Sequence, residues 1–158
     1  MTPVPPAFRF YLRVRYQECD AQGVVFNARY GDYVDIAMTE FLRNMGYREA
    51  LQSGDLDVQL VKQTTTWKAP ARNDDVLELS VRSIAQGTTS FTLITEFRRA
   101  GHAAITCEVE TVYVRVEGKV LTKRPLGEDF RAALMRGSAG AIVDHAGYLS
   151  IGAGQRVT

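Results

Sequence analysis

The feature that most constrains this fold is a pattern repeated four times between residues 58 and 121. Each repeat is a run in which apolar and polar side chains alternate, followed by a short turn. No helical pattern separates the runs, so a doubly wound parallel sheet, which needs a helix between successive strands, is excluded. Consecutive antiparallel strands are predicted at residues 58–67, 76–84, 90–97 and 104–116, with a last hairpin at 117–119 leading into Val120 and Leu121.

One strand and one helix precede these runs. Residues 10–17 alternate in the same way and predict a first strand. From about Asn27 the spacing becomes helical, with Asn27 as a plausible N-cap and Gly46 where a left-handed residue ends a helix. The apolar face of this helix consists of Tyr30, Tyr33, Val34, Ala37, Phe41 and Met45. The pattern favours an α+β fold in which one helix packs on a curved antiparallel sheet.

The length of 158 residues is that of one domain with a single core. Residues 125–135 predict a short final helix, whereas 137–158 is rich in Gly and Ala and lacks periodicity. We therefore expect one domain over residues 1–136, followed by an appendage of undetermined structure over 137–158.

Charge and composition exclude several function classes. Nineteen basic and eighteen acidic residues give a formal charge of +1, so no electrostatic footprint for nucleic acid or an anionic membrane is expected. The first seven residues lack the features of a secretory signal, and no segment is apolar over a membrane-spanning length, which predicts a cytoplasmic protein. Cys19 and Cys107 have neither the number nor the spacing of a zinc site or a disulfide framework, so both are interpreted as packed, reduced thiols.

The junction between the first strand and the helix is where chemistry is expected. Asp20 and Gly23 lie in a turn that leads into a helix N-terminus, where unpaired N–H groups and the helix dipole favour negative charge. A carboxylate beside such an oxyanion-binding point is the minimum machinery for acyl transfer. The alternative is that Asp20 only caps the loop by accepting bonds from neighbouring N–H groups.

Two segments resemble the acyl-CoA thioester hydrolases of the 4-hydroxybenzoyl-CoA thioesterase type. The first is residues 13–33, RVRYQECDAQGVVFNARYGDY, followed by TEFLR at 39–43; the second is WKAPARNDDVLE at 67–78. With the strand order, the resemblance covers about residues 10–134. It implies a hotdog fold, in which a sheet wraps a central helix, and subunits that pair edge to edge as a homodimer or homotetramer.

Carried over residue by residue, the resemblance assigns the catalytic carboxylate to Asp20 and the glycine of the turn to Gly23. The helix start that polarises the thioester carbonyl falls on Val25, Phe26, Asn27 and Ala28. Some members carry His or Tyr where this chain has Asn27, and an amide side chain offers no proton-donating acid. A backbone N–H donor survives that difference.

The resemblance also implies acyl-CoA as the substrate, with no cofactor or metal besides the CoA it carries. Certain relatives hold CoA phosphates with basic residues before the strand that begins near residue 90, where this chain has threonines. Lys68 and Arg72 are the substitutes considered, against the alternative that both are solvated charges at a turn. The expected substrate contacts are Tyr30, Lys68, Arg72, Thr89 and Ser90.

Other assignments stay open. Glu40 on the helix is a second candidate carboxylate, with a solvated or ion-paired role as the alternative. A hydratase on the same fold pairs a histidine with an acid, and neither His102 nor His145 is near the loop or the helix in sequence. A non-catalytic acyl-CoA-binding hotdog module is the alternative from a different class.

Overall fold

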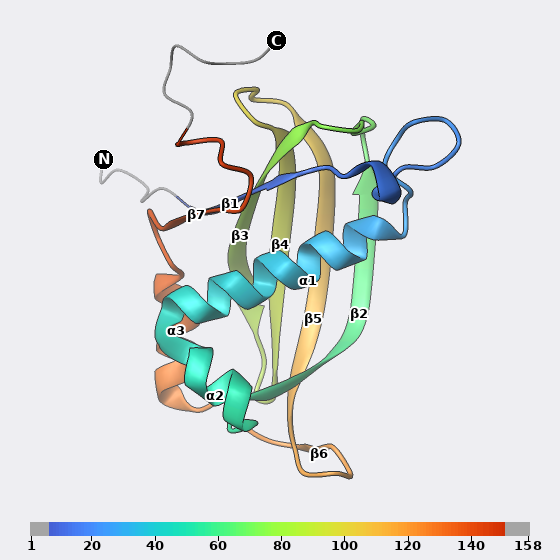
Figure 1. Ribbon diagram of the computed structural model, residues 1–158. Coiled ribbons are helices and arrows are strands. Elements are labelled where there is room, and N and C mark those ends of the chain that lie inside the picture. Colours follow the sequence, from blue (N-terminus) through green and yellow to red (C-terminus); the bar gives the residue numbers. More distant parts are fainter. Residues whose placement is uncertain (1–6, 151–158) are drawn as a thin grey trace.

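The computed structural model describes residues 7–150 and consists of one curved sheet with a long helix across it (Figure 1). The four repeated runs form β2 (Asp57–Trp67), β3 (Val76–Gln86), β4 (Ser90–Arg99) and β5 (Ile105–Glu117). Their order in the sheet is β2-β5-β4-β3, and each neighbouring pair is antiparallel. The α+β class and the strands predicted from the alternation are therefore confirmed.

Helix α1 (Arg29–Leu42) lies across the face of the sheet that carries the buried side chains (Figure 1). Alternation puts every second residue of β3, β4 and β5 on that face, and these side chains pack under the apolar face of the helix. The fully buried side chains that the two layers share are Phe41, Leu77, Leu79, Phe91, Leu93, Phe97, Cys107 and Val109.

The sequence predicted that the helix ends at Gly46, but the helical chain continues beyond this residue. A five-residue π-helical stretch (Arg43–Tyr47) follows α1, and Gly46 adopts a left-handed φ of 94° within it. The chain kinks there and continues as α2 (Arg48–Ser53). Glycine takes a positive φ at no steric cost, so it produces a bend here instead of an end.

The first strand is shorter than its alternation indicates. β1 (Phe8–Arg13) pairs antiparallel with β3, and Tyr16–Glu18 then forms a 3₁₀ turn. Tyr16, predicted to continue the buried face, is 84% exposed. The strand ends because the Glu18 carboxylate accepts the Arg15 N–H at 2.7 Å, which closes the turn locally.

The end of the sheet and the last helix also differ in detail. The sequence predicted a turn at 117–119 that leads into a strand at Val120 and Leu121. Instead both residues belong to the exposed turn, and β6 (Thr122–Lys123) pairs with β5 just after it. α3 (Glu128–Arg136) is the predicted final helix, begun three residues later than expected.

Part of the predicted appendage belongs to the sheet. β7 (Ile142–Asp144) pairs with β1, in parallel, so the sheet is mixed and not purely antiparallel. Tyr148 stacks on Tyr11 with ring centroids 5.1 Å apart, and His145 packs edge-on against Phe10 at 4.8 Å. Residues 142–148 thus pack against the outer side of β1. The domain boundary at residue 136 stays a prediction.

Candidate active site

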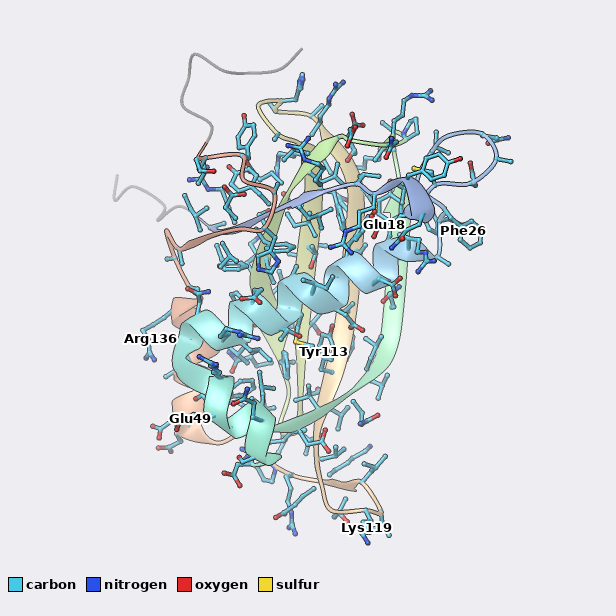
Figure 2. The ribbon with its side chains drawn as sticks, in the orientation of Figure 1. Glu18, Phe26, Glu49, Tyr113, Lys119 and Arg136 are labelled. Carbon is cyan, nitrogen blue, oxygen red and sulfur yellow. The ribbon has the colours of Figure 1, made fainter. Side chains whose placement is uncertain are left out.

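The loop between β1 and α1 is a tight hairpin held by backbone hydrogen bonds. Asp20 N donates to Val24 O at 2.8 Å, and Phe26 N donates to Glu18 O at 2.9 Å. Figure 2 shows Glu18 and Phe26 close together at the beginning of α1. Gly23 takes a φ of 75° and turns the chain, as its place in the sequence predicted. The hairpin therefore holds Asp20 opposite Val24, three positions before Asn27.

Two backbone N–H groups at the start of α1 are left without acceptors. Val25 N donates to Ala71 O at 2.8 Å and Phe26 N to Glu18, whereas the N–H groups of Asn27 and Ala28 find no acceptor among residues 7–150. The predicted capping by Asn27 is wrong, because Ala28 occupies the cap position and no side chain caps the helix. Unpaired donors at the positive end of a helix dipole are suited to an oxyanion.

The Asp20 side chain is exposed and only partly engaged. Its Oδ1 accepts the Gln22 N–H at 2.8 Å, the capping role considered as the alternative. Its Oδ2 has no partner in the described part of the chain. One oxygen therefore holds the loop, and the other is available for chemistry.

The turn between β2 and β3 contacts this hairpin. Val24 forms an isolated bridge with Arg72, which brings Arg72 beside the Asp20 loop. The Arg72 backbone N–H donates to the Asp75 carboxylate at 2.8 Å, while its guanidinium makes no ion pair with any described carboxylate. Lys68 differs, since its Nζ lies 3.3 Å from Glu108. Of these two cationic side chains, Arg72 is therefore the one without an ion pair to a described carboxylate.

Thr89 and Ser90 lie at the opposite end of the sheet within one protomer. Trp67, near the hairpin, pairs with Cys107, whereas Ser90 pairs with Val114. The separation of seven positions along β5 corresponds to about 23 Å. The structure therefore does not bring Thr89 and Ser90 to Asp20.

Tyr30 belongs to the core under the start of the helix. It is 3% exposed, and its ring packs edge-on against Tyr33, Trp67 and Phe97. Burial raises the pKa of Tyr30 to about 12. Its ring supports the beginning of α1 and presents little surface to a ligand.

The two cysteines and Glu40 are less suited than Asp20 to act as a nucleophile. Burial raises the pKa of Cys107 to about 12, and burial followed by the neighbouring carboxylates Asp20 and Glu18 raises that of Cys19. Both cysteines thus remain thiols. Glu40 lies 3.5 Å from Arg43 Nε and 3.8 Å from His145 Nε2, in agreement with the ion-paired alternative.

The expectation that no histidine lies near the central helix is wrong in space. β7 carries His145 to Glu40 of α1, although the two residues are 105 positions apart. This contact depends on the pairing of β7 with β1, which sequence periodicity could not reveal. The backbone acceptors Glu18 and Ala71, which leave only two free N–H groups at the helix start, were missed for the same reason: their roles depend on tertiary pairing.

The described residues form neither a metal centre nor a membrane-spanning helix. No group of three or more His, Cys, Asp or Glu side chains is arranged to hold a metal ion. Within the same residues, no helix combines the length and the apolar character needed to cross a bilayer.

The sequence is similar to known thioesterases over most of its length. Residues 14–134 match the model of the thioesterase-like superfamily. The chain belongs to this superfamily. A curated relative, the acyl-CoA thioester hydrolase YbgC of Escherichia coli O6:H1, is 32% identical over 120 residues, which cover 75% of this chain and 89% of the relative. A putative esterase of Aquifex aeolicus is 33% identical over 90 residues, 55% of this chain and 70% of that protein.

Solved structures of thioesterases share the fold. A 4-hydroxybenzoyl CoA thioesterase mutant complexed with 4-hydroxybenzoyl CoA superposes with a TM-score of 0.73 at 17% identity, covering 80% of this chain and 96% of that one. A 1,4-dihydroxy-2-naphthoyl-CoA thioesterase from Synechocystis gives 0.72 at 21% identity, covering 81% and 95%. These matches confirm the hotdog fold that the sequence resemblance implied for this protein.

Proposed function

We propose that this protein hydrolyses an acyl-CoA thioester to a carboxylic acid and free CoA. The observation that carries the proposal is the pair of unpaired N–H groups at Asn27 and Ala28, beside the hairpin that holds Asp20. The names of the curated relatives support the same reaction.

The thioester carbonyl oxygen accepts from the two backbone donors, which stabilise the negative charge that develops on it. Asp20 Oδ2 then acts in one of two ways. It attacks the carbonyl carbon, CoA leaves as its thiolate and water hydrolyses the resulting anhydride; or it takes a proton from a water molecule that attacks directly. Both routes consume one water and release one acid and one thiol.

Arg72 is the residue proposed to contact the CoA phosphates. Its guanidinium is uncommitted and lies on the turn that bridges to Val24, and a guanidinium binds phosphate oxygens through two parallel N–H groups. Lys68 contributes less, because Glu108 already neutralises it. Thr89 and Ser90 offer only hydroxyls and lie far along the sheet.

The protein is further proposed to act as a homodimer joined through β2. β2 is an edge strand of eleven residues whose outer backbone pairs with no other described strand. Leu60, Val61 and Trp67 on it are 45%, 59% and 51% exposed. A long unpaired strand edge is normally covered, and an antiparallel pair of β2 strands about a two-fold axis covers the edge and these three side chains in both copies.

The deciding experiment is thiol release from short, long and aromatic acyl-CoAs by the wild type and by Asp20→Asn. The amide keeps the size of the side chain and its bond to Gln22, but it is neither nucleophilic nor basic. We expect turnover to fall by at least about 10³-fold in Asp20→Asn with folding unchanged. The matched control is Asp129→Asn, an exposed residue of α3, which should retain wild-type turnover.

Other outcomes change the proposal in defined ways. Full activity in Asp20→Asn removes the carboxylate from the mechanism. No hydrolysis of any thioester, with saturable binding of one of them, favours a non-catalytic acyl-CoA-binding module in which Asp20 only holds its loop.

A further inference from the structure

Glu18 ends the 3₁₀ turn that leads from β1 into the Asp20 hairpin. Its Oε1 accepts the Arg15 N–H at 2.7 Å, and its own N–H donates to Arg15 O at 3.0 Å. A hydrogen bond accepted by a carboxylate is stronger than one between neutral groups. The conformation of the turn therefore depends on this side chain, two residues before Asp20.

The carbonyl oxygen of Glu18 holds the returning strand of the hairpin. It accepts the Phe26 N–H at 2.9 Å, and the neighbouring residue Cys19 forms an isolated bridge with Val25. Figure 2 shows Glu18 and Phe26 close together at the beginning of α1. Phe26 directly precedes Asn27, which carries the first of the two unpaired N–H groups. The place of Glu18 thus determines where these donors lie relative to the hairpin.

Tyr33 of α1 brings the helix to the same carboxylate. Tyr33 is 2% exposed, and together with Glu18 it lines the groove between β1 and α1. Burial, followed by the Glu18 carboxylate, raises the pKa of the Tyr33 hydroxyl, so the hydroxyl keeps its proton at neutral pH. A protonated hydroxyl beside a carboxylate is attracted to it. Glu18 is therefore held from the helix as well as from the turn.

We propose that Glu18 is a positioning residue for the hydrolysis. Its carboxylate and its carbonyl oxygen together hold the Asp20 hairpin against the start of α1, so that Asp20 and the N–H groups of Asn27 and Ala28 keep a fixed separation. Glu18 itself takes no proton and forms no bond to the substrate. This inference rests on the proposed hydrolysis, in which a misplacement of about 1 Å can cost about 10²-fold in rate.

The first test is steady-state kinetics with the acyl-CoA that the wild type hydrolyses fastest. In Glu18→Ala we expect kcat to fall by about 10- to 100-fold with KM little changed, because the loss is one of geometry in the transition state. Glu18→Gln keeps a carbonyl oxygen that accepts from Arg15 and Tyr33, and should restore kcat to within about threefold of the wild type. The matched control is Gln17→Ala, an exposed residue of the same turn, which should retain wild-type kinetics.

The second test needs no turnover. Amide hydrogen exchange of Phe26, followed by NMR, should become at least about tenfold faster in Glu18→Ala and should not change in Glu18→Gln or Gln17→Ala. Tyr33→Phe removes one oxygen atom and should lower kcat severalfold, which keeps the test available if Glu18→Ala does not fold.

Three results would overturn the proposal. Equal losses of kcat in Glu18→Gln and Glu18→Ala would show that the charge matters and not the placement. Unchanged Phe26 exchange in Glu18→Ala, or wild-type kcat in both Glu18→Ala and Tyr33→Phe, would show that Glu18 does not hold the hairpin. A wild type that hydrolyses no thioester would refute the hydrolysis alone, and the exchange measurement would then decide whether Glu18 holds the hairpin.

Discussion

Thr95 carries a buried hydroxyl group without a partner in the core of this protein. It is 1% exposed on the helix-facing side of β4, and its Oγ1 bonds to no described residue. On the neighbouring strand β5, the hydroxyls of Thr111 and Tyr113 face each other, and Figure 2 shows Tyr113 beneath α1. The Thr95 hydroxyl loses its bonds to water on folding, so the core is less stable than an apolar one of equal shape.

Thr95→Val tests this cost directly. Valine has the same branched shape and suits a strand equally well, so the substitution replaces only the unpartnered hydroxyl by a methyl group. We expect the free energy of unfolding to rise by about 1 kcal/mol in urea denaturation. Thr92→Val, on the opposite face of β4, is the control and should change it by less than about 0.5 kcal/mol. A loss of stability in Thr95→Val would mean that the hydroxyl is satisfied.

Among the secondary-structure elements, the kink at Gly46 separates α1 from α2 and directs α2 towards the end of the sheet near α3 (Figure 1). A Cβ placed on Gly46 would meet no atom within 4 Å. The only obstacle to a larger residue is therefore its φ of 94°.

Gly46→Ala is expected to lower the free energy of unfolding by about 1–2 kcal/mol, the cost of a left-handed conformation for an L-residue. Gly31→Ala is the contrasting variant. It lies inside α1, where a Cβ would come no closer than 3.8 Å to Gln63 Nε2, and should raise stability by up to about 1 kcal/mol. Thermal unfolding of both variants measures the difference. Similar shifts in the same direction would contradict the conformational argument.

The loop after β7 is organised by one carboxylate. Asp144 Oδ1 accepts the N–H groups of Ala146 and Tyr148 at 3.0 and 3.1 Å, and Oδ2 accepts that of Leu149 at 2.8 Å. Burial alone would raise the pKa of Asp144, but these bonds outweigh it and the pKa lies below its ordinary value.

This lowered pKa fixes the sign of a pH effect. The stabilisation from Asp144 is fully present above its unfolded pKa of about 3.9 and is lost as pH falls through the lower folded pKa. We expect the amide resonances of Ala146, Tyr148 and Leu149 to titrate together in NMR spectra with a midpoint below 3.9. A shared midpoint at or above 3.9 would show that the carboxylate does not hold the loop.

The elements that sequence predicted best are those whose pattern is local and long. β3, β4 and β5 alternate over ten or more residues, and the burial of their side chains follows the alternation. β7 has three residues and forms by pairing with β1, so its own sequence contains no pattern long enough to predict it.

The same distinction holds for the candidate site. Asp20 and Gly23 were identified by a turn and a resemblance confined to one segment. The donors that remain free at the helix start could not be chosen from the sequence, because Ala71 and Glu18 occupy the other two through tertiary pairing. Arg72 could be preferred to Lys68 only once the ion pair with Glu108 was visible.

At the scale of the whole molecule, the exposed edge of β2 makes the dimer testable. We expect the wild type to be a dimer in light scattering and the double variant Leu60→Lys with Val61→Lys to be monomeric, because like charges would face each other across the two-fold axis. Val120→Lys, in the hairpin turn before β6 and 85% exposed, is the control and should remain dimeric. A dimeric double variant would place the interface elsewhere.

β7 limits how far the sheet can be extended by pairing with further copies of the protein. At the other side of the sheet it lies along β1, so within residues 7–150 the backbone of β1 is hydrogen-bonded on both sides. β7 itself is only three residues long, a poor template for another chain. Among the strands of the described residues, β2 is therefore the one able to pair with a second copy. Joining through it consumes the strand in both molecules, so growth by sheet extension stops at two and does not continue into a fibre.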